Sequence, residues 1–213
     1  MPVYSALVPM KAFVLSLLLL SSGLASAATG MFGSYIQINT GTSVVYDLQQ
    51  YGPTDHTDFN GFNFGALVPA TDTFSIANAS GLTFKSGGGD VTGVELQYRV
   101  YKVGNTPGAF ATRSLNFGAN ATATDLGGNT FSGGGDQEWR GLSGGGSINL
   151  LSLANAGAGD YKVEVFLHAF TNEGDRYSNN SGSNFIAVFS IPEPSRALLL
   201  MLGLLVPAFR RRR

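Results

Sequence analysis

Cysteine is missing from this chain altogether, and histidine, tryptophan and charged residues are scarce: there are two His and one Trp, and 13% of the residues are charged. Without cysteine the protein has no disulfides, thiolate zinc sites, iron–sulfur clusters or cysteine nucleophile, and no cysteine to carry a lipid anchor. Its stability must therefore come from burial of a core. Two histidines also leave few candidate bases for a serine triad.

Charge is distributed unevenly along the sequence. Six of the 13 basic residues lie near the termini (Lys11, Arg196 and the last four residues), whereas only Glu193 of the 14 acidic residues does. Seven basic and 13 acidic residues remain between them, so the body of the chain has a net charge of −6. An acidic body without a basic stripe cannot release the counterions of a polynucleotide, and this excludes nucleic acid as a partner.

The N-terminus has the pattern of a secretory signal peptide. An apolar run from Ala12 to Leu20 is followed by small residues that end in Ala25-Ser26-Ala27. Ala25 and Ala27 form the A-x-A site at which a signal peptidase cleaves. We therefore expect residues 1–27 to be removed on export; a membrane-anchoring N-terminal helix is the alternative. The start stays open between Met1 and Met10, because the first nine residues carry no charge.

The C-terminus has three parts in order. Pro192-Glu193-Pro194 comes first, an apolar run from Ala197 to Phe209 follows, and the chain finishes with four basic residues, Arg210, Arg211, Arg212 and Arg213. The 13 apolar residues would form a helix of about 20 Å, shorter than the roughly 30 Å hydrocarbon core of a bilayer. The arginines can snorkel to the interface, and the positive-inside rule places them in the cytoplasm. The body of the chain would then face outward, held by a weak anchor.

This arrangement resembles the PEP-CTERM sorting signal of Gram-negative bacteria that make extracellular polysaccharide. The resemblance covers residues 191–213, and Pro207 inside the apolar run is its one unusual feature. It implies that an exosortase, a membrane-embedded cysteine protease or transpeptidase, recognises Pro192, Glu193 and Pro194 as substrate residues. It also implies transient anchoring in the inner membrane, followed by delivery to the cell surface or beyond. A permanent tail anchor is the alternative.

Residues 28–190, between the two signals, are predicted to form one all-β domain. Polar and apolar residues alternate most clearly over Val94 to Val103 and Tyr161 to Phe170, and Phe185 to Ile191 is apolar on both sides, as in a central strand. Many short strands separated by turns indicate an antiparallel β-sandwich, immunoglobulin-like or jelly roll, of open strand order. Weaker strands are expected at 35–39, 44–48, 59–64, 73–77, 82–85, 114–117, 137–140 and 148–153.

Glycine-rich segments separate these strands. Residues 86–90 and 132–136 both read Ser-Gly-Gly-Gly-Asp, but their flanks differ and no sustained calcium-binding repeat follows, so we interpret them as turns. Residues 141–145 match the G-x-S-x-G pattern of a nucleophilic serine, here Ser143. That mechanism requires a strand, a sharp turn and a helix, whereas glycines and a predicted strand follow Ser143. We interpret this segment as a turn too.

Candidate metal ligands are few. His56 lies in a polar loop and His168 on the polar face of a predicted strand, and ordinary loop or packing roles explain both more simply than zinc. Calcium needs only oxygen ligands, and Asn172, Glu173 and Asp175 form an oxygen-rich loop between two strands. Calcium there is the better metal hypothesis, with a plain hairpin loop as the alternative; no other cofactor is expected.

The single tryptophan, Trp139, is interpreted either as a core residue or as a platform on which a sugar ring stacks. Glu95, Glu138 and Glu164 are scattered in the sequence, and nothing pairs two of them for glycoside hydrolysis. We therefore expect a non-catalytic surface or extracellular-matrix protein associated with exopolysaccharide, and not an enzyme. The alternative is a carbohydrate-binding, lectin-like module.

Overall fold

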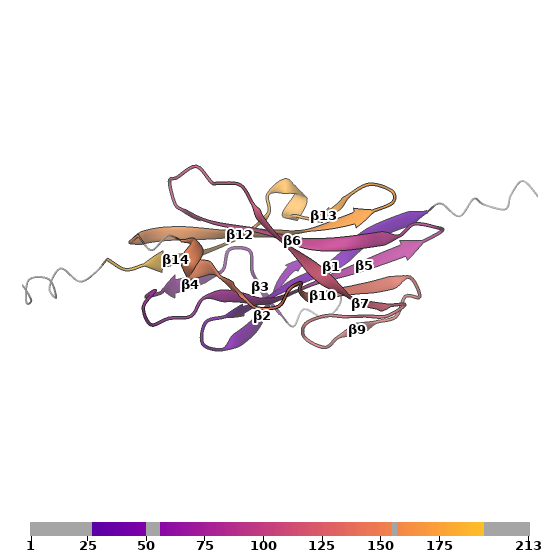
Figure 1. The fold of residues 1–213 in the computed structure, drawn as a ribbon, viewed down its shortest axis with the longest axis horizontal. Coiled ribbons are helices and arrows are strands. Elements are labelled where there is room, and N and C mark those ends of the chain that lie inside the picture. The colour runs from indigo at the N-terminus through magenta and orange to yellow at the C-terminus, as the bar shows by residue number, and fades with distance from the viewer. Residues whose placement is uncertain (1–26, 50–55, 155–156, 194–213) are drawn as a thin grey trace, which may run out of the picture.

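The structure is a computed structural model, described here for residues 27–49, 56–154 and 157–193 (Figure 1). The regular structure of these residues is almost entirely β, which confirms the predicted all-β class. None of their helices is long and apolar enough to cross a membrane. The predicted signal peptide up to residue 26 and the apolar run 197–209 lie outside the described residues, as do the four basic residues of the C-terminus, Arg210, Arg211, Arg212 and Arg213.

The predicted strands appear with few exceptions. Phe185 to Ile191 is one strand as expected, although only one of its faces is fully buried. Residues 75–77 and 82–85 belong to a single strand, and 148–153 is a two-residue strand followed by one helical turn. The predicted strand at 59–64 is wrong for 59–62, which form a turn, and only 63 and 64 lie in a strand. The strands are β1 (Ala28–Asn39), β2 (Ser43–Gln49), β3 (Thr57–Asp58), β4 (Asn63–Ala66), β5 (Ser75–Ser86), β6 (Val91–Lys102), β7 (Ala111–Asn120), β8 (Ala123–Thr124), β9 (Thr130–Phe131), β10 (Asp136–Leu142), β11 (Ile148–Asn149), β12 (Gly159–Thr171), β13 (Arg176–Ser178) and β14 (Phe185–Ile191), and the helical turns are α2 (Leu150–Leu153) and a 3-10 turn (Asn180–Gly182).

Twelve of these strands form one hydrogen-bonded sheet, and β8 and β9 form a separate two-stranded hairpin. The order along the large sheet is β3-β2-β1-β5-β10-β7-β6-β12-β14-β4, with β11 beside β5 and β13 beside β12. Two pairings at the ends of this order are parallel, β2 with β3 and β14 with β4. The expectation of a purely antiparallel fold is therefore wrong at both ends of the sheet.

The sheet curls strongly, as a half-barrel, and folds over on itself. Figure 1 shows a lower layer of β1, β2, β5 and β10 and an upper layer of β6, β12, β13 and β14. Strand β7 pairs with β10 on one side and with β6 on the other, so it carries the sheet from one layer to the next. The core fills the space between the layers; Ile36, Ile76, Leu96, Val165 and Phe189 belong to it and are each at most 2% exposed.

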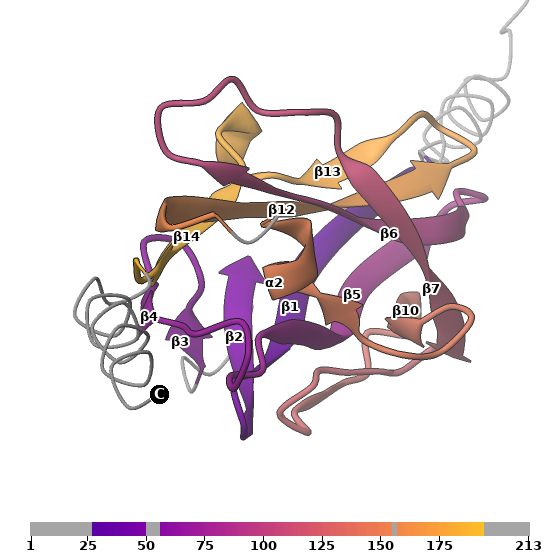
Figure 2. The same ribbon diagram turned by 60° about the vertical axis from the view of Figure 1, so that its left-hand side comes forward.

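One short stretch of chain covers both ends of the sheet. Strands β3 and β4, which terminate the strand order, follow each other in the sequence, and Figure 2 shows them side by side between β2 and β14. The Phe59 amide donates to the Asp47 carbonyl of β2, while the Val188 amide of β14 donates to the Phe62 carbonyl, both at 2.9 Å. We call residues 57–67 the closing segment.

Aromatic side chains of the closing segment also pack into the core. Phe59 is completely buried, and Phe62 and Phe64 pack beside it. The ring of Tyr46 lies 4.9 Å from that of Phe62 and 5.5 Å from that of Phe64, and the Phe64 and Phe74 rings are 4.7 Å apart. Edge-to-face contacts of this kind add to the burial of apolar area. Aromatic packing and backbone hydrogen bonds together hold the segment across both sheet edges.

A buried acid lies where the closing segment meets β2. Asp47 is opposite Asp58 in the β2–β3 pairing and is 5% exposed, and its Oδ1 has no hydrogen-bond partner in the described part of the chain. Burial and the neighbouring charge of Asp58 raise the pKa of Asp47 from 3.8 to about 7. The folded state therefore favours the protonated carboxyl, whereas the unfolded chain ionises it in mild acid.

We predict that this acid makes the protein less stable at neutral than at mildly acidic pH. Because its pKa is raised on folding, its contribution is complete below about pH 4 and is lost as the pH rises to about 7. The shift corresponds to at most about 4 kcal/mol. Urea unfolding of Asp47→Asn should show most of this pH dependence abolished. Asp160→Asn, at an exposed position of β12, should keep the wild-type slope; equal slopes in all three proteins would contradict the prediction.

Candidate functional site

The outer face of the upper layer carries a row of aromatic side chains. Alternation along β12 turns Val165 and Leu167 into the core and Phe166, His168 and Phe170 outward. Strand β6 alternates in the same way, and its outward residues lie beside those of β12, with Gln97 opposite Phe166 and Glu95 opposite His168. Strand β13 adds Tyr177 opposite His168 on the other side.

The rings form a continuous strip. The ring centroids of Phe110 and Phe166 are 5.0 Å apart, those of Phe166 and Tyr177 6.4 Å, and those of Tyr177 and His168 4.6 Å. The His168 and Phe170 centroids are 4.2 Å apart. We call this set, extended at one end by Arg99 and Tyr101, the aromatic strip.

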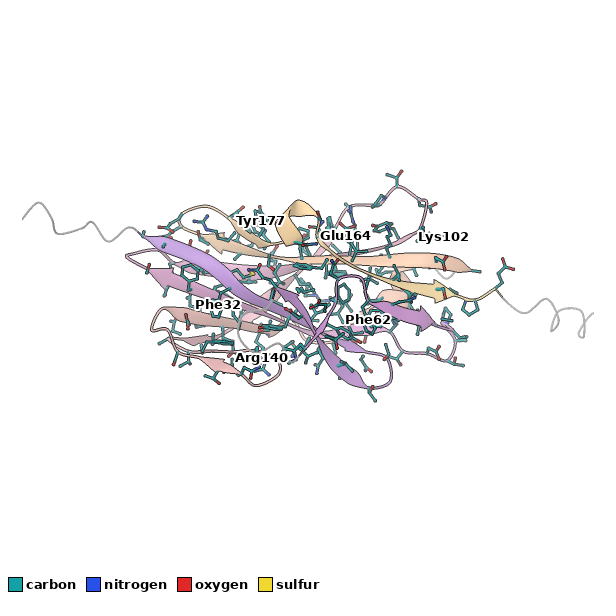
Figure 3. The ribbon with its side chains drawn as sticks, turned by 180° about the vertical axis from the view of Figure 1, so that it is seen from behind. Phe32, Phe62, Lys102, Arg140, Glu164 and Tyr177 are labelled. Atoms are coloured by element: carbon teal, nitrogen blue, oxygen red, sulfur yellow. The ribbon has the colours of Figure 1, made fainter. Side chains whose placement is uncertain are left out.

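The strip is open to solvent. Tyr177 is 49% exposed and Phe170 is 37% exposed, while the other rings are half-buried. Figure 3 labels Tyr177 on the upper layer. Several adjoining exposed rings are uncommon on a soluble monomer and mark an interaction surface.

An ion pair anchors one end of the strip. The Arg99 Nε and Nη2 atoms both lie 2.8 Å from Glu164 Oε2, and the side-chain Nδ2 of Asn184 donates to Glu164 Oε1 at 2.6 Å. Glu164 is only 4% exposed, so this pair is largely removed from water. The Arg99 guanidinium also lies 4.0 Å from the Phe110 ring centroid and 5.5 Å from that of Tyr101. Arg99 thereby positions both rings.

Acidic groups lie along the rest of the strip. His168 Nε2 is 3.1 Å from Asp175 Oδ2, and the Tyr177 hydroxyl donates to the same oxygen at 3.4 Å. Desolvation, and then the charge of Asp175, raise the pKa of the Tyr177 hydroxyl, which therefore stays protonated in neutral solution. Glu95 accepts hydrogen bonds from Gln97 at 3.2 Å and from Ser114 at 3.3 Å. The rings are thus bordered by donors and acceptors.

Trp139 belongs to the core and not to this surface. It is 7% exposed, its indole N–H donates to the Thr83 hydroxyl at 3.2 Å, and the Phe117 ring packs on it at 5.1 Å. Its side chain points between the layers, where it joins the main core cluster. This placement agrees with the core interpretation and leaves the indole little exposed surface on which a sugar ring could stack.

The proposed calcium loop is held by protein contacts. Asn172 accepts from the Asp90 amide and donates to the Gly88 carbonyl, which ties the loop to the β5–β6 turn. Glu173 accepts from the Thr29 hydroxyl, while Asp175 faces His168. The three side chains turn to different partners, and no cluster of three His, Asp or Glu side chains suited to a metal occurs in the described residues. The arrangement matches the plain hairpin alternative.

The remaining candidates are not brought together. Ser143 lies in the turn after β10, where its amide donates to the Ser114 carbonyl. His56 Nε2 is 3.7 Å from Asp125, and its ring packs against Tyr35 of the lower layer, whereas His168 lies on the upper layer. Ser143 thus lies in a turn, as the sequence predicted, and the two histidines lie on different layers of the fold.

The sorting residues lie at the limit of the described chain. Pro192 and Glu193 follow β14 directly and are exposed, whereas Pro194 lies outside the described residues. The same is true of Ala25, while Ala27 is the first residue described. The basic end of the signal also falls outside them, so the membrane-anchoring role stays a prediction for Arg210, Arg211, Arg212 and Arg213. In Figure 1, β1 begins at one end of the body and β14 finishes at the other.

Comparison with known proteins gives only remote likenesses. No model of a known protein family matches the sequence, and no curated protein does. A family 123 glycoside hydrolase from Clostridium perfringens is similar over 79% of this chain and 28% of its own, with 10% identity and a TM-score of 0.34. The CooA pilin subunit from enterotoxigenic Escherichia coli is similar over 67% of this chain and 97% of its own, with 12% identity and a TM-score of 0.27. The chain thus spans about a quarter of the hydrolase's length.

We predict that removing one partner of the Arg99–Glu164 ion pair destabilises the fold more than removing both partners. Glu164→Ala leaves the Arg99 guanidinium without its partner in a half-buried site and should cost about 3–5 kcal/mol in the free energy of unfolding. The double variant Arg99→Met, Glu164→Leu removes both charges and should cost markedly less. Urea denaturation measures both. A single variant as stable as the wild type, or a double variant less stable than the single one, would contradict this interpretation.

Proposed function

We propose that the protein is a non-catalytic, exported surface or extracellular-matrix protein that contacts exopolysaccharide through the aromatic strip. The signal in residues 191–213 would deliver it, after recognition by an exosortase and transient anchoring in the inner membrane. The observation that carries the polysaccharide contact is the row of exposed and half-buried rings, bordered by hydrogen-bonding groups, on the outer face of β6, β12 and β13.

The chemistry of the strip suits a sugar chain. The faces of pyranose rings carry C–H groups that pack on aromatic rings, while their hydroxyls need donors and acceptors at the border. Tyr177, Gln97 and Glu95 supply such groups here. Beside β12 the strip extends from position 162 to position 170, a length of about 25 Å. An open strip of this length favours a polymer over a small enclosed ligand.

The carboxylates around the strip support a non-catalytic role. Glu164 is bound by Arg99 and Asn184, Glu95 accepts from Gln97 and Ser114, and Asp175 faces His168. A glycosidase needs one carboxylic acid and one carboxylate facing the same bond. The acids here are engaged in holding the surface together, which favours binding over hydrolysis.

We further propose that the body is a variant of the β-sandwich class, immunoglobulin-like or jelly roll. The two facing layers with a core between them support this assignment. Its departure is β7, which pairs with strands of both layers.

We predict that the two most exposed rings of the strip, Phe170 at its end and Tyr177 within it, contribute directly to polysaccharide affinity. Phe170→Ala and Tyr177→Ala should each weaken binding of the full-length protein to exopolysaccharide from its host by about fivefold to tenfold. Affinity gel electrophoresis or calorimetry measures the change. Phe84→Ala removes an equally exposed ring, at 37%, from the lower layer and is the matched control.

Two results would contradict this proposal: equal affinities of all four proteins, or binding lost equally with Phe84→Ala. If short oligosaccharides bind as tightly as the polymer, the lectin-like alternative is correct.

We predict two processing events in the native host. Intact mass spectrometry should find the mature protein without residues 1–27 and without the arginine-ended tail, and deletion of the exosortase should restore the tail. Pro192→Ala combined with Glu193→Ala should have the same effect, because it alters the recognised residues. Asp160→Ala, at an exposed position of the body, leaves the signal intact and should be processed normally. A full-length chain in the cytosol of the host would contradict the sorting proposal.

A further inference from the structure

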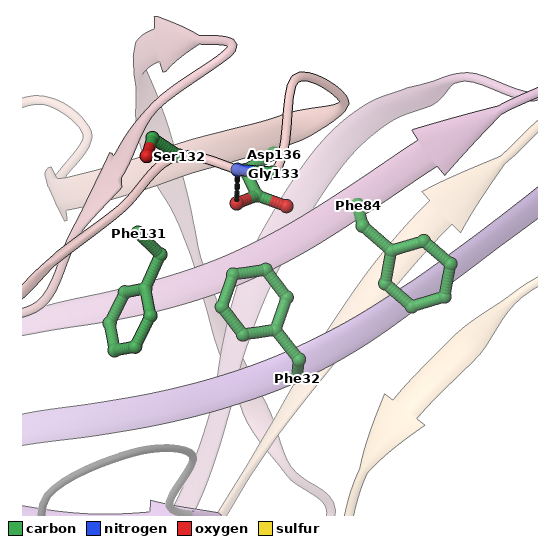
Figure 4. A pocket seen from close by; sticks show the side chains of 6 residues that line it. All are labelled: Phe32, Phe84, Phe131, Ser132, Gly133 and Asp136. Carbon is green, nitrogen blue, oxygen red and sulfur yellow. Dashed lines mark hydrogen bonds between the residues drawn. The ribbon is translucent and has the colours of Figure 1, made fainter.

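The outer face of the lower layer holds a second ring-lined site, on the other side of the molecule from the aromatic strip. Phe32 of β1, Phe84 of β5 and Phe131 of β9 line a pocket of about 430 Å³ together with Ser132, Gly133 and Asp136. Figure 4 shows the three rings along one side and the Asp136 carboxylate on the other. A pocket of this size accommodates a small organic molecule.

Strand register and one glycine place the two principal side chains. Phe84 lies directly opposite Asp136 on β10 and opposite Gly30 on β1. A Cβ atom at Gly30 would collide with the Phe84 ring, so the glycine lets this ring lie flat against β1. The Phe84 ring and the Asp136 carboxylate therefore lie side by side because their residues are cross-strand partners.

A bulge and a hairpin supply the other two rings. The β1–β5 register shifts between Met31 and Gly33, which leaves Phe32 as the extra residue at the pocket. Phe131 comes from the β8–β9 hairpin and packs edge-on against Phe32 at a centroid distance of 5.6 Å. The Thr124 amide of β8 donates to Glu138 of β10 at 2.9 Å and fixes the hairpin over the sheet.

The aspartates of the two Ser-Gly-Gly-Gly-Asp segments have different partners. Asp90, in the first, forms an ion pair with Lys85 at 2.8 Å. Asp136, in the second, accepts a hydrogen bond from the Gly133 amide at 2.6 Å. No basic side chain of the described ranges forms an ion pair with Asp136, and none lines the pocket. Within the described ranges, its negative charge therefore lies beside the phenyl rings without a counter-ion.

We propose that this pocket binds a small organic cation with a quaternary, trimethylammonium-type head group. A cation over aromatic rings is attracted by their quadrupoles, and the Asp136 carboxylate adds a direct charge interaction. An anion would be repelled by Asp136 and by the net charge of −6 on the body. A neutral apolar molecule would desolvate the carboxylate without compensating it.

The wall chemistry also distinguishes between kinds of cation. Calcium needs six or more oxygen ligands, whereas this pocket offers one carboxylate and one serine hydroxyl. A primary ammonium carries three N–H donors that need acceptors, and the phenyl walls supply none. A quaternary ammonium has no N–H donor and presents only methyl groups, so it is the cation that carbon walls and a single carboxylate satisfy.

The test compares choline with 3,3-dimethylbutan-1-ol, its uncharged carbon isostere, on the full-length protein. Titration is followed by NMR shifts of Phe32, Phe84 and the Gly133 amide. Choline should bind saturably in the millimolar range and at least about tenfold more tightly than the alcohol, because only the cation gains the charge and ring interactions. Equal affinity of the two probes, or no saturable choline binding, overturns the proposal.

Matched variants locate the interaction. Asp136→Asn keeps an acceptor for the Gly133 amide and removes the charge, so the preference for choline should fall about tenfold. Phe84→Ala should weaken choline binding, whereas Asp90→Asn, in the twin segment, should leave it unchanged. Circular dichroism verifies that each variant is folded, and the two-probe comparison on the wild type decides the matter even where a variant is not. Choline binding that persists unchanged in Asp136→Asn and Phe84→Ala would place it elsewhere and overturn the proposal.

Discussion

The fold depends on the pairing of one closing segment with two sheet edges. A sheet that curls into a half-barrel leaves an exposed edge at each end, and exposed edges invite pairing with other chains. Here the ends are β2 and β14, and residues 57–67 bond to both through β3 and β4. Phe59, Phe62 and Phe64 fix the segment in the core. At this junction the fold strongly disfavours the charged form of the buried Asp47 carboxyl.

Because the closing segment covers both sheet edges, the outer faces of the two layers are the surfaces on which a ligand can bind. The upper face presents the aromatic strip, which the Arg99–Glu164 pair anchors at one end. The lower face is partly covered by the β8–β9 hairpin, and the ring-lined pocket lies beside that cover. The surfaces differ in shape: one is long and open, the other is a compact hollow with a single carboxylate. The proposed ligands, a sugar polymer and a small cation, suit these two shapes respectively and would not compete.

Local patterns predicted the strands well and the sites poorly. Alternation located β6 and β12, an apolar run located β14, and Trp139 lies in a weaker predicted strand whose inward face belongs to the core. The residues of α2 were assigned to a strand because Leu150 and Leu151 are apolar, as in a strand, and the capping role of Asn149 becomes apparent only from the hydrogen bond that its side chain accepts from the Ser152 amide. The aromatic strip combines β12 with residues 110 and 177, which lie outside the predicted strands. Only the alternation of rings along β12 was a local signal for it. Parallel end pairings depend on contacts distant in sequence, and no local period reports them.

Amide hydrogen exchange tests the central claim, that one segment closes both edges. The reporters are the amides of Phe59, which bonds to β2, and of Gly61, Leu67 and Val188, which take part in the bonding to β14. If a single segment holds both edges, these amides become accessible in one opening event and should show the same free energy of exchange. The account is contradicted if Gly61, Leu67 and Val188 exchange rapidly while Phe59 stays protected, since the two edges would then open independently.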